Sequence, residues 1–266
     1  NILKKKFYNY YKELEIINHV AANNKRNIHD LCYPDLASTI VFFGHHKCAS
    51  RFFRNQVFSR VAEDIDAQTR SYYIKNPPFH YTSCDDLDLY NIDFSHLGEK
   101  GKDIVLFSNA TERSLRRISE NTIDWLGLRI IRDPRQVFIS NYLHHKGSHY
   151  ADYSHIQGWI WDQLLHDKPI LRSLPVEDGL EYELNNISKQ IIETQVLAPF
   201  DDKRILTIKL EDFQSNSEHY LTMISEFFGI AYIAGVDFQK TEANPDSGPW
   251  QSFFTPKIKE IFKARY

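Results

Sequence analysis

Residues 41–52 have the sequence Val41-Phe42-Phe43-Gly44-His45-His46-Lys47-Cys48-Ala49-Ser50-Arg51-Phe52. An apolar run passes into a glycine, then a lysine, three small residues and a segment with helical spacing. This order is typical of a buried strand followed by a loop and a helix whose first N–H groups point at an anion. Lys47 adds a full positive charge to that loop. The Gly-x-x-x-x-Gly-Lys-Ser/Thr spacing is absent, so an ordinary Walker A loop is disfavoured. The plainer alternative is a strand–helix turn with an exposed lysine.

Four short apolar runs predict buried strands, and helical patterns separate them. The runs lack alternation of apolar and polar residues, as do strands that are covered on both faces. Strands that alternate with helices favour one α/β domain with a central, mainly parallel β-sheet, over residues 1–266. The strands are Thr39–Phe43, Ile104–Phe107, Leu128–Ile131 and Ile205–Ile208. The helical segments include Phe52–Glu63, Glu112–Asp124, a single long helix spaced by Leu180, Leu184, Ile187 and Ile191, and Leu221–Phe228.

Helix boundaries are marked by capping residues. Asp133-Pro134 and Thr255-Pro256 each place an N-cap residue before a proline at the first helical position, and Gly229 is a stop signal. Residues 1–30 are expected to form a helical extension at the N-terminus, because 3–19 have an amphipathic pattern. In sheets of this kind ligands bind beyond the carboxyl ends of the strands, so the loops after the strands are where a site is expected.

Composition excludes several classes of protein. The chain has 266 residues, 42% apolar, with 32 Lys and Arg against 35 Asp and Glu, for a net charge of −3. That balance gives no broad basic field, so binding to nucleic acid is not expected and any anionic ligand must be held by local charge. The sequence contains no run of 18 apolar residues, so no membrane-spanning helix is expected. Three cysteines do not form a disulfide pattern, which favours a reducing compartment and a cytoplasmic location.

A second loop carries chemistry at the end of the third predicted strand. Arg132 stands where Leu128–Ile131 ends, Asp133 follows it as a helix cap, and Ser140 lies almost two turns into the helix. An arginine at a strand end can direct two N–H donors at a phosphate, and a nearby hydroxyl can add a third donor. The alternative is that Arg132 pairs with Asp133 or Asp212.

Together the two loops resemble the motifs of sulfotransferases that use 3′-phosphoadenosine-5′-phosphosulfate (PAPS). The family's Pro-Lys-Ser-Gly-Thr-Thr-Trp matches residues 46–52 in register, and its Arg-(Asn/Asp)-Pro-(Lys/Arg)-Asp-Val with a serine eight residues after the arginine matches residues 132–140. Leu210-Glu211-Asp212 resembles the family's Tyr-Glu-Asp. Gly248-Pro249-Trp250 with Phe254-Thr255 resembles its Gly-Asp-Trp and Phe-Thr. The matches run from about residue 39 to the C-terminus, and the resemblance implies a P-loop-like α/β fold.

The resemblance also implies roles for single residues. Lys47 and the amides of Cys48, Ala49, Ser50 and Arg51 would hold the 5′-phosphosulfate, Phe52 would stack on adenine, and Arg132 with Ser140 would bind the 3′-phosphate. The product is 3′,5′-adenosine bisphosphate (PAP), and no metal is implied. This sequence departs from the pattern at three places: Ala49 replaces a glycine, Leu210 replaces a tyrosine, and Ala243-Asn244-Pro245 replaces the usual Arg-Lys-Gly.

The acceptor must lose a proton, which calls for a histidine or a carboxylate near the sulfur. Asn109 occupies the place at which many family members have a histidine. His80 is our first candidate for the base; His45, His46, His144, His145, Asp85, Asp86 and Glu112 are alternatives. Residues 70–103 are expected to form the acceptor side, and their aromatic and acidic side chains favour a small polar or cationic molecule. A surface cover held by aromatics is the alternative for that region.

Three rival functions are compatible with parts of the sequence. The spacing Cys48-x5-Arg54 is that of a cysteine phosphatase, which would use a thiolate nucleophile. A P-loop kinase or NTPase would need magnesium. A nucleotide-binding module that has lost catalysis is consistent with Asn109. The main prediction is a PAPS-dependent sulfotransferase that transfers the sulfuryl group to a hydroxyl or an amine.

Overall fold

The computed structural model describes residues 37–65, 97, 102–107, 110–148, 159–197, 202–236, 238 and 249–266. The expected N-terminal extension at 1–30 and almost all of the expected acceptor region at 70–103, with His80, Asp85 and Asp86, lie outside the described residues. Asn109 lies outside them as well. The four predicted strands and most of the helices fall within them.

The described strands form one parallel sheet with the order β2-β1-β3-β4. Its strands are β1 (Thr39–Phe43), β2 (Asp103–Phe107), β3 (Trp125–Ile131) and β4 (Ile205–Lys209). All four predicted strands are confirmed, and three of them extend one to three residues further than the apolar runs. Phe43 at the end of β1 lies opposite Phe107 of β2 and Arg129 of β3, so the loops after these strands leave the same edge.

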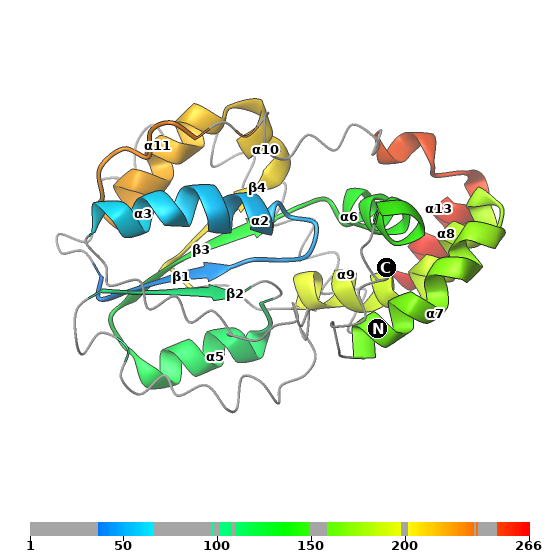
Figure 1. The fold of residues 1–266 in the computed structure, drawn as a ribbon, viewed down its shortest axis with the longest axis horizontal. Helices are drawn as coiled ribbons and strands as arrows, with labels where there is room; N and C mark the ends of the chain where they lie inside the picture. The colour runs from blue at the N-terminus through cyan, green and yellow to red at the C-terminus, as the bar shows by residue number, and fades with distance from the viewer. Residues whose placement is uncertain are drawn as a thin grey trace.

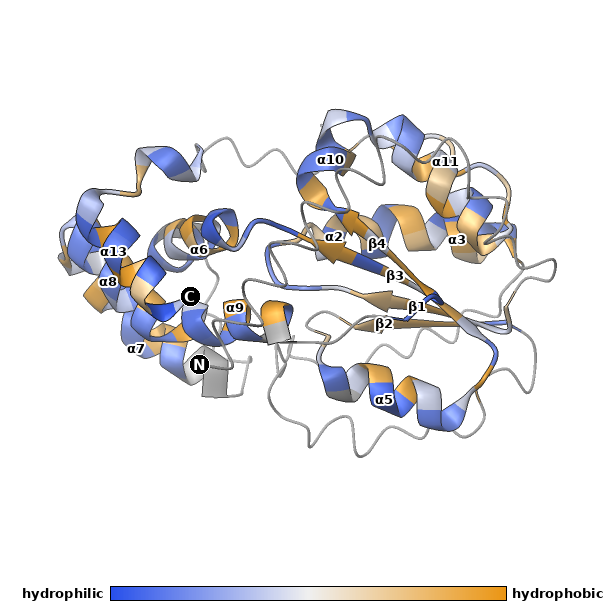
Figure 2. Ribbon diagram, turned by 180° about the vertical axis from the view of Figure 1, so that it is seen from behind, coloured by the Kyte–Doolittle hydropathy of each residue, from blue (hydrophilic) through white to orange (hydrophobic). Residues whose placement is uncertain are grey.

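Helices cover both faces of the sheet, which explains why its strands are mostly apolar without alternating apolar and polar residues (Figures 1 and 2). One face carries α3 (Phe58–Asp64) and α11 (Ser217–Phe228), and the other carries α5 (Glu112–Asn121). Successive side chains of β1 pack on opposite faces of the sheet. Phe42 packs against Phe53 and Phe58, whereas Phe43 packs against Phe107 and Trp125. Each fully buried phenylalanine contributes about 1.5–3 kcal/mol to stability.

A helical lobe lies beyond the carboxyl edge of the sheet, on the side toward which the strand arrows point (Figure 1). It begins with α6, which directly follows β3 and continues into a wider π-helical turn, η3. The lobe contains α6 (Pro134–Leu143), η3 (His144–Ser148), α7 (Trp159–Ser173), α8 (Val176–Asn185), α9 (Ile187–Leu197) and α13 (Pro256–Arg265). The remaining elements are α2 (Ser50–Phe52), the π-helical η2 (Phe53–Val57), α10 (Leu210–Ser215) and the 3₁₀ turn η4 (Trp250–Ser252).

The predicted caps are confirmed. The Asp133 carboxylate accepts the Arg135 amide at 2.8 Å at the start of α6, and the Thr255 hydroxyl accepts the Ile258 amide at the start of α13. Gly229 ends α11 with a φ of 65°, a conformation that glycine adopts without strain. Within the described ranges no helix is both long and apolar enough to cross a membrane.

Three predicted helices have different boundaries in the structure. The single helix expected over Leu180–Ile191 is two helices, because Asn186 leaves helical geometry with a φ of −114° and a ψ of −116°. Its side-chain Nδ2 donates to the Tyr182 carbonyl, and its backbone N–H donates to the Glu183 carbonyl. The apolar spacing survives this break, so the pattern alone did not indicate it. The helix after β1 is interrupted by the turn η2. The helix α5 ends at Asn121, and Asp124 instead accepts the Ser38 amide with its carboxylate at 2.8 Å.

Candidate functional site

The loop after β1 takes a strained left-handed path through two residues that are not glycine. Lys47 has a φ of 62° and Ala49 a φ of 55°. Each such residue costs about 1–2 kcal/mol, a cost that is commonly found at binding sites. Two hydrogen bonds to the His45 carbonyl close the turn. Their donors are the Cys48 amide at 3.1 Å and the Ser50 hydroxyl at 2.7 Å. Ala49 thus adopts a conformation that glycine reaches without strain.

Gly44 joins the start of this loop to the end of β2. Its amide donates to the Phe107 carbonyl at 3.0 Å, and its own carbonyl accepts the Ala110 amide at 2.8 Å. A Cβ at this position would stand 2.7 Å from the Phe107 oxygen and 2.6 Å from a ring carbon of Phe42. Only glycine therefore fits where the backbone at Gly44 approaches that at Phe107. This close approach fixes where the loop leaves the sheet.

The two predicted loops meet at the carboxyl edge of the sheet. The Arg132 guanidinium donates from Nη1 to the Lys47 carbonyl at 2.9 Å. The Asp133 carboxylate, which could have paired with Arg132, is instead bound by Arg135 at 2.6 Å. Glu211 accepts the Asp133 amide at 3.0 Å and so anchors this strand end to α10. Two basic side chains thus stand on neighbouring strand ends, as an anionic ligand requires.

Gln195 of α9 holds both loops together, a role that no sequence pattern indicates. Its Oε1 accepts the Cys48 thiol at 2.9 Å, and its Nε2 donates to the Arg132 carbonyl at 2.8 Å. Its backbone carbonyl accepts Nη2 of Arg129 at 3.0 Å. This buried side chain therefore links the helical lobe to the ends of β1 and β3. Gln195 is one of two glutamines in a helix of mixed composition, and no pattern there predicts such a role.

The buried Cys48 thiol does not fit the phosphatase alternative. The side chain is fully buried and its thiol donates to Gln195. Burial raises the pKa of the Cys48 thiol, and this effect outweighs the opposite influence of the Arg132 and Arg129 charges. A cysteine phosphatase needs a thiolate at neutral pH. The spacing to Arg54 is therefore not a sign of a nucleophilic cysteine.

The other predicted donor-site residues differ in their exposure. Arg51 is exposed and Ser50 is half-buried at the start of α2, whereas Ser140 is buried in α6. Phe52 is only 1% exposed, and its ring centroid lies 4.8 Å from that of Phe238 in a T-shaped contact. An adenine ring that stacked on Phe52 would therefore take the place of Phe238.

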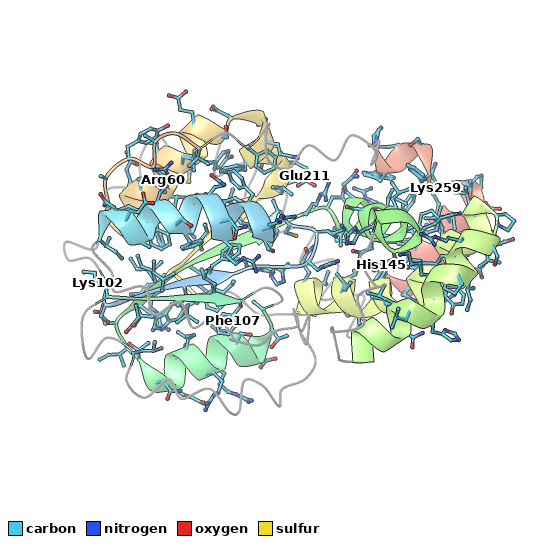
Figure 3. All side chains as sticks on the ribbon, viewed as in Figure 1. Arg60, Lys102, Phe107, His145, Glu211 and Lys259 are labelled. Carbon is cyan, nitrogen blue, oxygen red and sulfur yellow. The ribbon has the colours of Figure 1, made fainter. Side chains whose placement is uncertain are left out.

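Three of the candidate histidines gather beside Lys47. The ring centroid of His46 lies 6.2 Å from that of His145 and 6.5 Å from that of His144, and the latter two are 5.9 Å apart. The Nδ1 atom of His145, which Figure 3 labels, is 2.9 Å from Oε1 of Glu183. We call His46, His144 and His145 the histidine cluster.

His45 and Glu112 have other roles. His45 is buried, and its Nε2 accepts Nε of Arg129 at 3.4 Å. Burial, with a smaller contribution from the Arg129 charge, holds the pKa of His45 well below 6.5, so this imidazole is neutral and structural. Glu112 is exposed at the start of α5. In the part of the chain that the structure describes, no three His, Cys, Asp or Glu side chains are arranged to hold a metal ion.

Comparisons with known proteins give matches among solved structures only. No family model matches the chain, and no curated protein matches it in sequence. The mouse sulfotransferase SULT7A1 complexed with PAP is similar with a TM-score of 0.46 and 14% identity, over 91% of this chain and 88% of that chain. A sulfotransferase from Alicyclobacillus acidocaldarius is similar with a TM-score of 0.44 and 14% identity, over 85% of this chain and 89% of that chain.

Proposed function

We propose that this chain is a sulfotransferase that moves the sulfuryl group of PAPS to a hydroxyl or an amine of a small polar acceptor. The observation that carries the proposal is the hydrogen bond from Arg132 to the Lys47 carbonyl. It joins two loops that each resemble a phosphate-binding motif in sequence. They meet at the edge of a parallel sheet where ligands of α/β proteins bind.

The roles of the residues follow from the charges that the donor carries. The amides of Ala49, Ser50 and Arg51 face the 5′-phosphosulfate in this proposal, and Lys47 provides its countercharge. The Cys48 amide, which the family resemblance also implied for this role, is instead donated to the His45 carbonyl. Arg132 and Ser140 bind the 3′-phosphate.

Sulfuryl transfer proceeds by in-line attack of the acceptor oxygen or nitrogen on sulfur. The bond between sulfur and the bridging phosphate oxygen breaks, and its electron pair stays on PAP. Negative charge grows on that bridging oxygen, so a lysine beside it stabilises the transition state more than the ground state. We assign this part to Lys47. No metal ion takes part in the proposed step.

The test measures PAP binding by calorimetry and transfer of radiolabelled sulfate from PAPS to a panel of acceptors, with products identified by mass spectrometry. Lys47→Ala is expected to abolish transfer while the protein remains folded. Arg132→Ala removes a charged donor worth about 1.5–3 kcal/mol, so PAP affinity should fall about tenfold to a hundredfold. Arg60→Ala, at an exposed arginine that pairs with Glu63, is the matched control. Unchanged turnover in Lys47→Ala would refute the mechanism.

Two alternatives give different results in the same assays. A nucleotide-binding module without catalysis, which Asn109 keeps open, would bind PAP and transfer sulfate to no acceptor. A kinase would lose its activity in EDTA, whereas the proposed transfer should survive it.

A further inference from the structure

The helical lobe contains a buried pair, His145 and Glu183, that is not among the residues assigned to the donor. His145 and Glu183 are each 1% exposed, and Nδ1 of His145 is 2.9 Å from Oε1 of Glu183. The same carboxylate oxygen accepts the Ser188 hydroxyl at 2.6 Å, which fixes its position between α8 and α9. A carboxylate at Nδ1 holds the proton on that nitrogen, so Nε2 is the atom of His145 that can accept a proton.

This pair stands next to the reacting end of the proposed donor site. His46 directly precedes Lys47, and its ring stacks on that of His145 with an interplanar angle of 22°. The half-buried His144 completes the histidine cluster, with its ring near both of the others. His46 therefore connects the two groups. It is the chain neighbour of Lys47, which would meet the leaving oxygen, and its ring contacts that of His145, which Glu183 orients.

A second observation is a buried side chain in α6 whose hydrogen-bonding groups lack partners. Asn141, one turn before His145, is fully buried, and neither its amide nitrogen nor its amide oxygen has a hydrogen-bond partner among the described residues. A buried, unsatisfied amide costs about 1–3 kcal/mol, so a bound polar group that pairs with it recovers that cost. The π-helical turn that follows, η3, is a form of helix found frequently at functional sites.

We propose that His145, oriented by Glu183, is the base that takes the proton of the acceptor; this rests on the sulfotransferase function proposed above. The acceptor oxygen forms its bond to sulfur as its proton passes to Nε2 of His145, directly or through one water. The bond from sulfur to the bridging oxygen breaks, and PAP leaves with the electron pair. His145 becomes an imidazolium that the Glu183 carboxylate stabilises. Glu183 is a positioning residue, because it acts through His145.

The test compares His145→Gln with a matched control in the same chain. His166 pairs with Asp167 at 2.9 Å, as His145 does with Glu183, but its side chain is 67% exposed on α7. With a weakly acidic acceptor, His145→Gln is expected to lower kcat about 10²–10⁴-fold, and Glu183→Gln about 10–100-fold. His166→Gln should have wild-type turnover. The Kd of PAP should be the same in all four proteins, because the proposed base does not touch the donor.

Acceptor acidity separates a base from a residue that only supports the fold. A phenol that is already ionised at the assay pH needs no base, so the loss in His145→Gln should be much smaller with it than with a neutral phenol. If neither phenol is accepted, the slow hydrolysis of PAPS replaces them, because water also loses a proton. Should His145→Gln fail to fold, Glu183→Gln is measured in the same way.

Two results would overturn this assignment while leaving the sulfotransferase intact. One is equal turnover of His145→Gln, or of Glu183→Gln where the first does not fold, and His166→Gln on the neutral acceptor. The other is loss of turnover in His80→Gln together with retention in His145→Gln, which would make His80 the base. A wild-type protein that binds no PAP and transfers no sulfate would instead refute the function itself, and the base with it.

Discussion

Replacement of Gly44 by alanine tests whether the loop after β1 depends on a close backbone approach. The added Cβ would lie 2.6 Å from a ring carbon of Phe42, 2.7 Å from the Phe107 carbonyl oxygen and 3.0 Å from the Ser50 hydroxyl. Two of these distances are shorter than Cβ contacts found in proteins, and one of them is to backbone. Either β2 moves away from β1 or the loop moves away from both.

The cost of such overpacking is about 1–3 kcal/mol. For a chain of this size each kcal/mol lowers the melting temperature by about 2–4 °C, so we expect a fall of about 2–12 °C in thermal unfolding followed by circular dichroism. Affinity for PAP should fall as well, because the displaced residues precede Lys47 directly.

Gly147→Ala is the matched control. A Cβ at Gly147 meets nothing within 4 Å among the residues that the structure describes, and the residue lies in the helical turn η3. Alanine there should leave the melting temperature unchanged or raise it slightly, because alanine loses less conformational entropy on folding. A Gly44→Ala protein as stable as the wild type would show that the loop does not need this backbone approach.

The buried polar groups around the loop lead to three further predictions. Cys48 should resist alkylation in the native protein at pH 8 and react on unfolding, as measured by peptide mass spectrometry, because burial raises its pKa; rapid native labelling would contradict this. His45 is neutral when folded and has a pKa near 6.5 when unfolded, so the unfolded state binds more protons and stability should fall as the pH drops below 6.5, by up to about 1.4 kcal/mol per pH unit. His45→Gln should flatten that dependence in urea titrations, and an unchanged slope would exclude His45 as its source. Gln195→Leu leaves the Arg132 carbonyl without its donor, which should cost about 1–3 kcal/mol in the same titrations; wild-type stability would show that this link is dispensable.

Much of the fold could be predicted because local patterns determine it. The apolar runs placed all four strands, and the Asp133-Pro134 and Thr255-Pro256 pairs placed two helix starts where the structure has them. The parallel arrangement also brought the loops with Lys47 and Arg132 to one edge, as strand order and chain direction required. The break at Asn186 was missed because the apolar spacing continues across it.

The rest of the site depends on contacts between distant parts of the chain. Gln195 and Glu183 are ordinary polar residues in their helices, and nothing nearby in sequence distinguishes them. Their roles arise when α8 and α9 pack against the sheet edge and against η3. Likewise, the spacing from Cys48 to Arg54 suggested a reactive thiol, and only the burial of Cys48 corrects that reading.

The hydrogen bonds that join the lobe to the sheet edge also bear on the order of folding. Arg132 and Lys47 are 85 residues apart, Gln195 and Arg132 are 63 apart, and Gln195 and Cys48 are 147 apart. Contacts of such long sequence separation close large loops and form slowly. The individual helices, whose hydrogen bonds are local, can therefore form before the proposed donor site exists, and a nascent chain acquires that site only after α9 has been synthesised. PAP, which would bind only the completed edge, would then stabilise the last-formed part of the molecule.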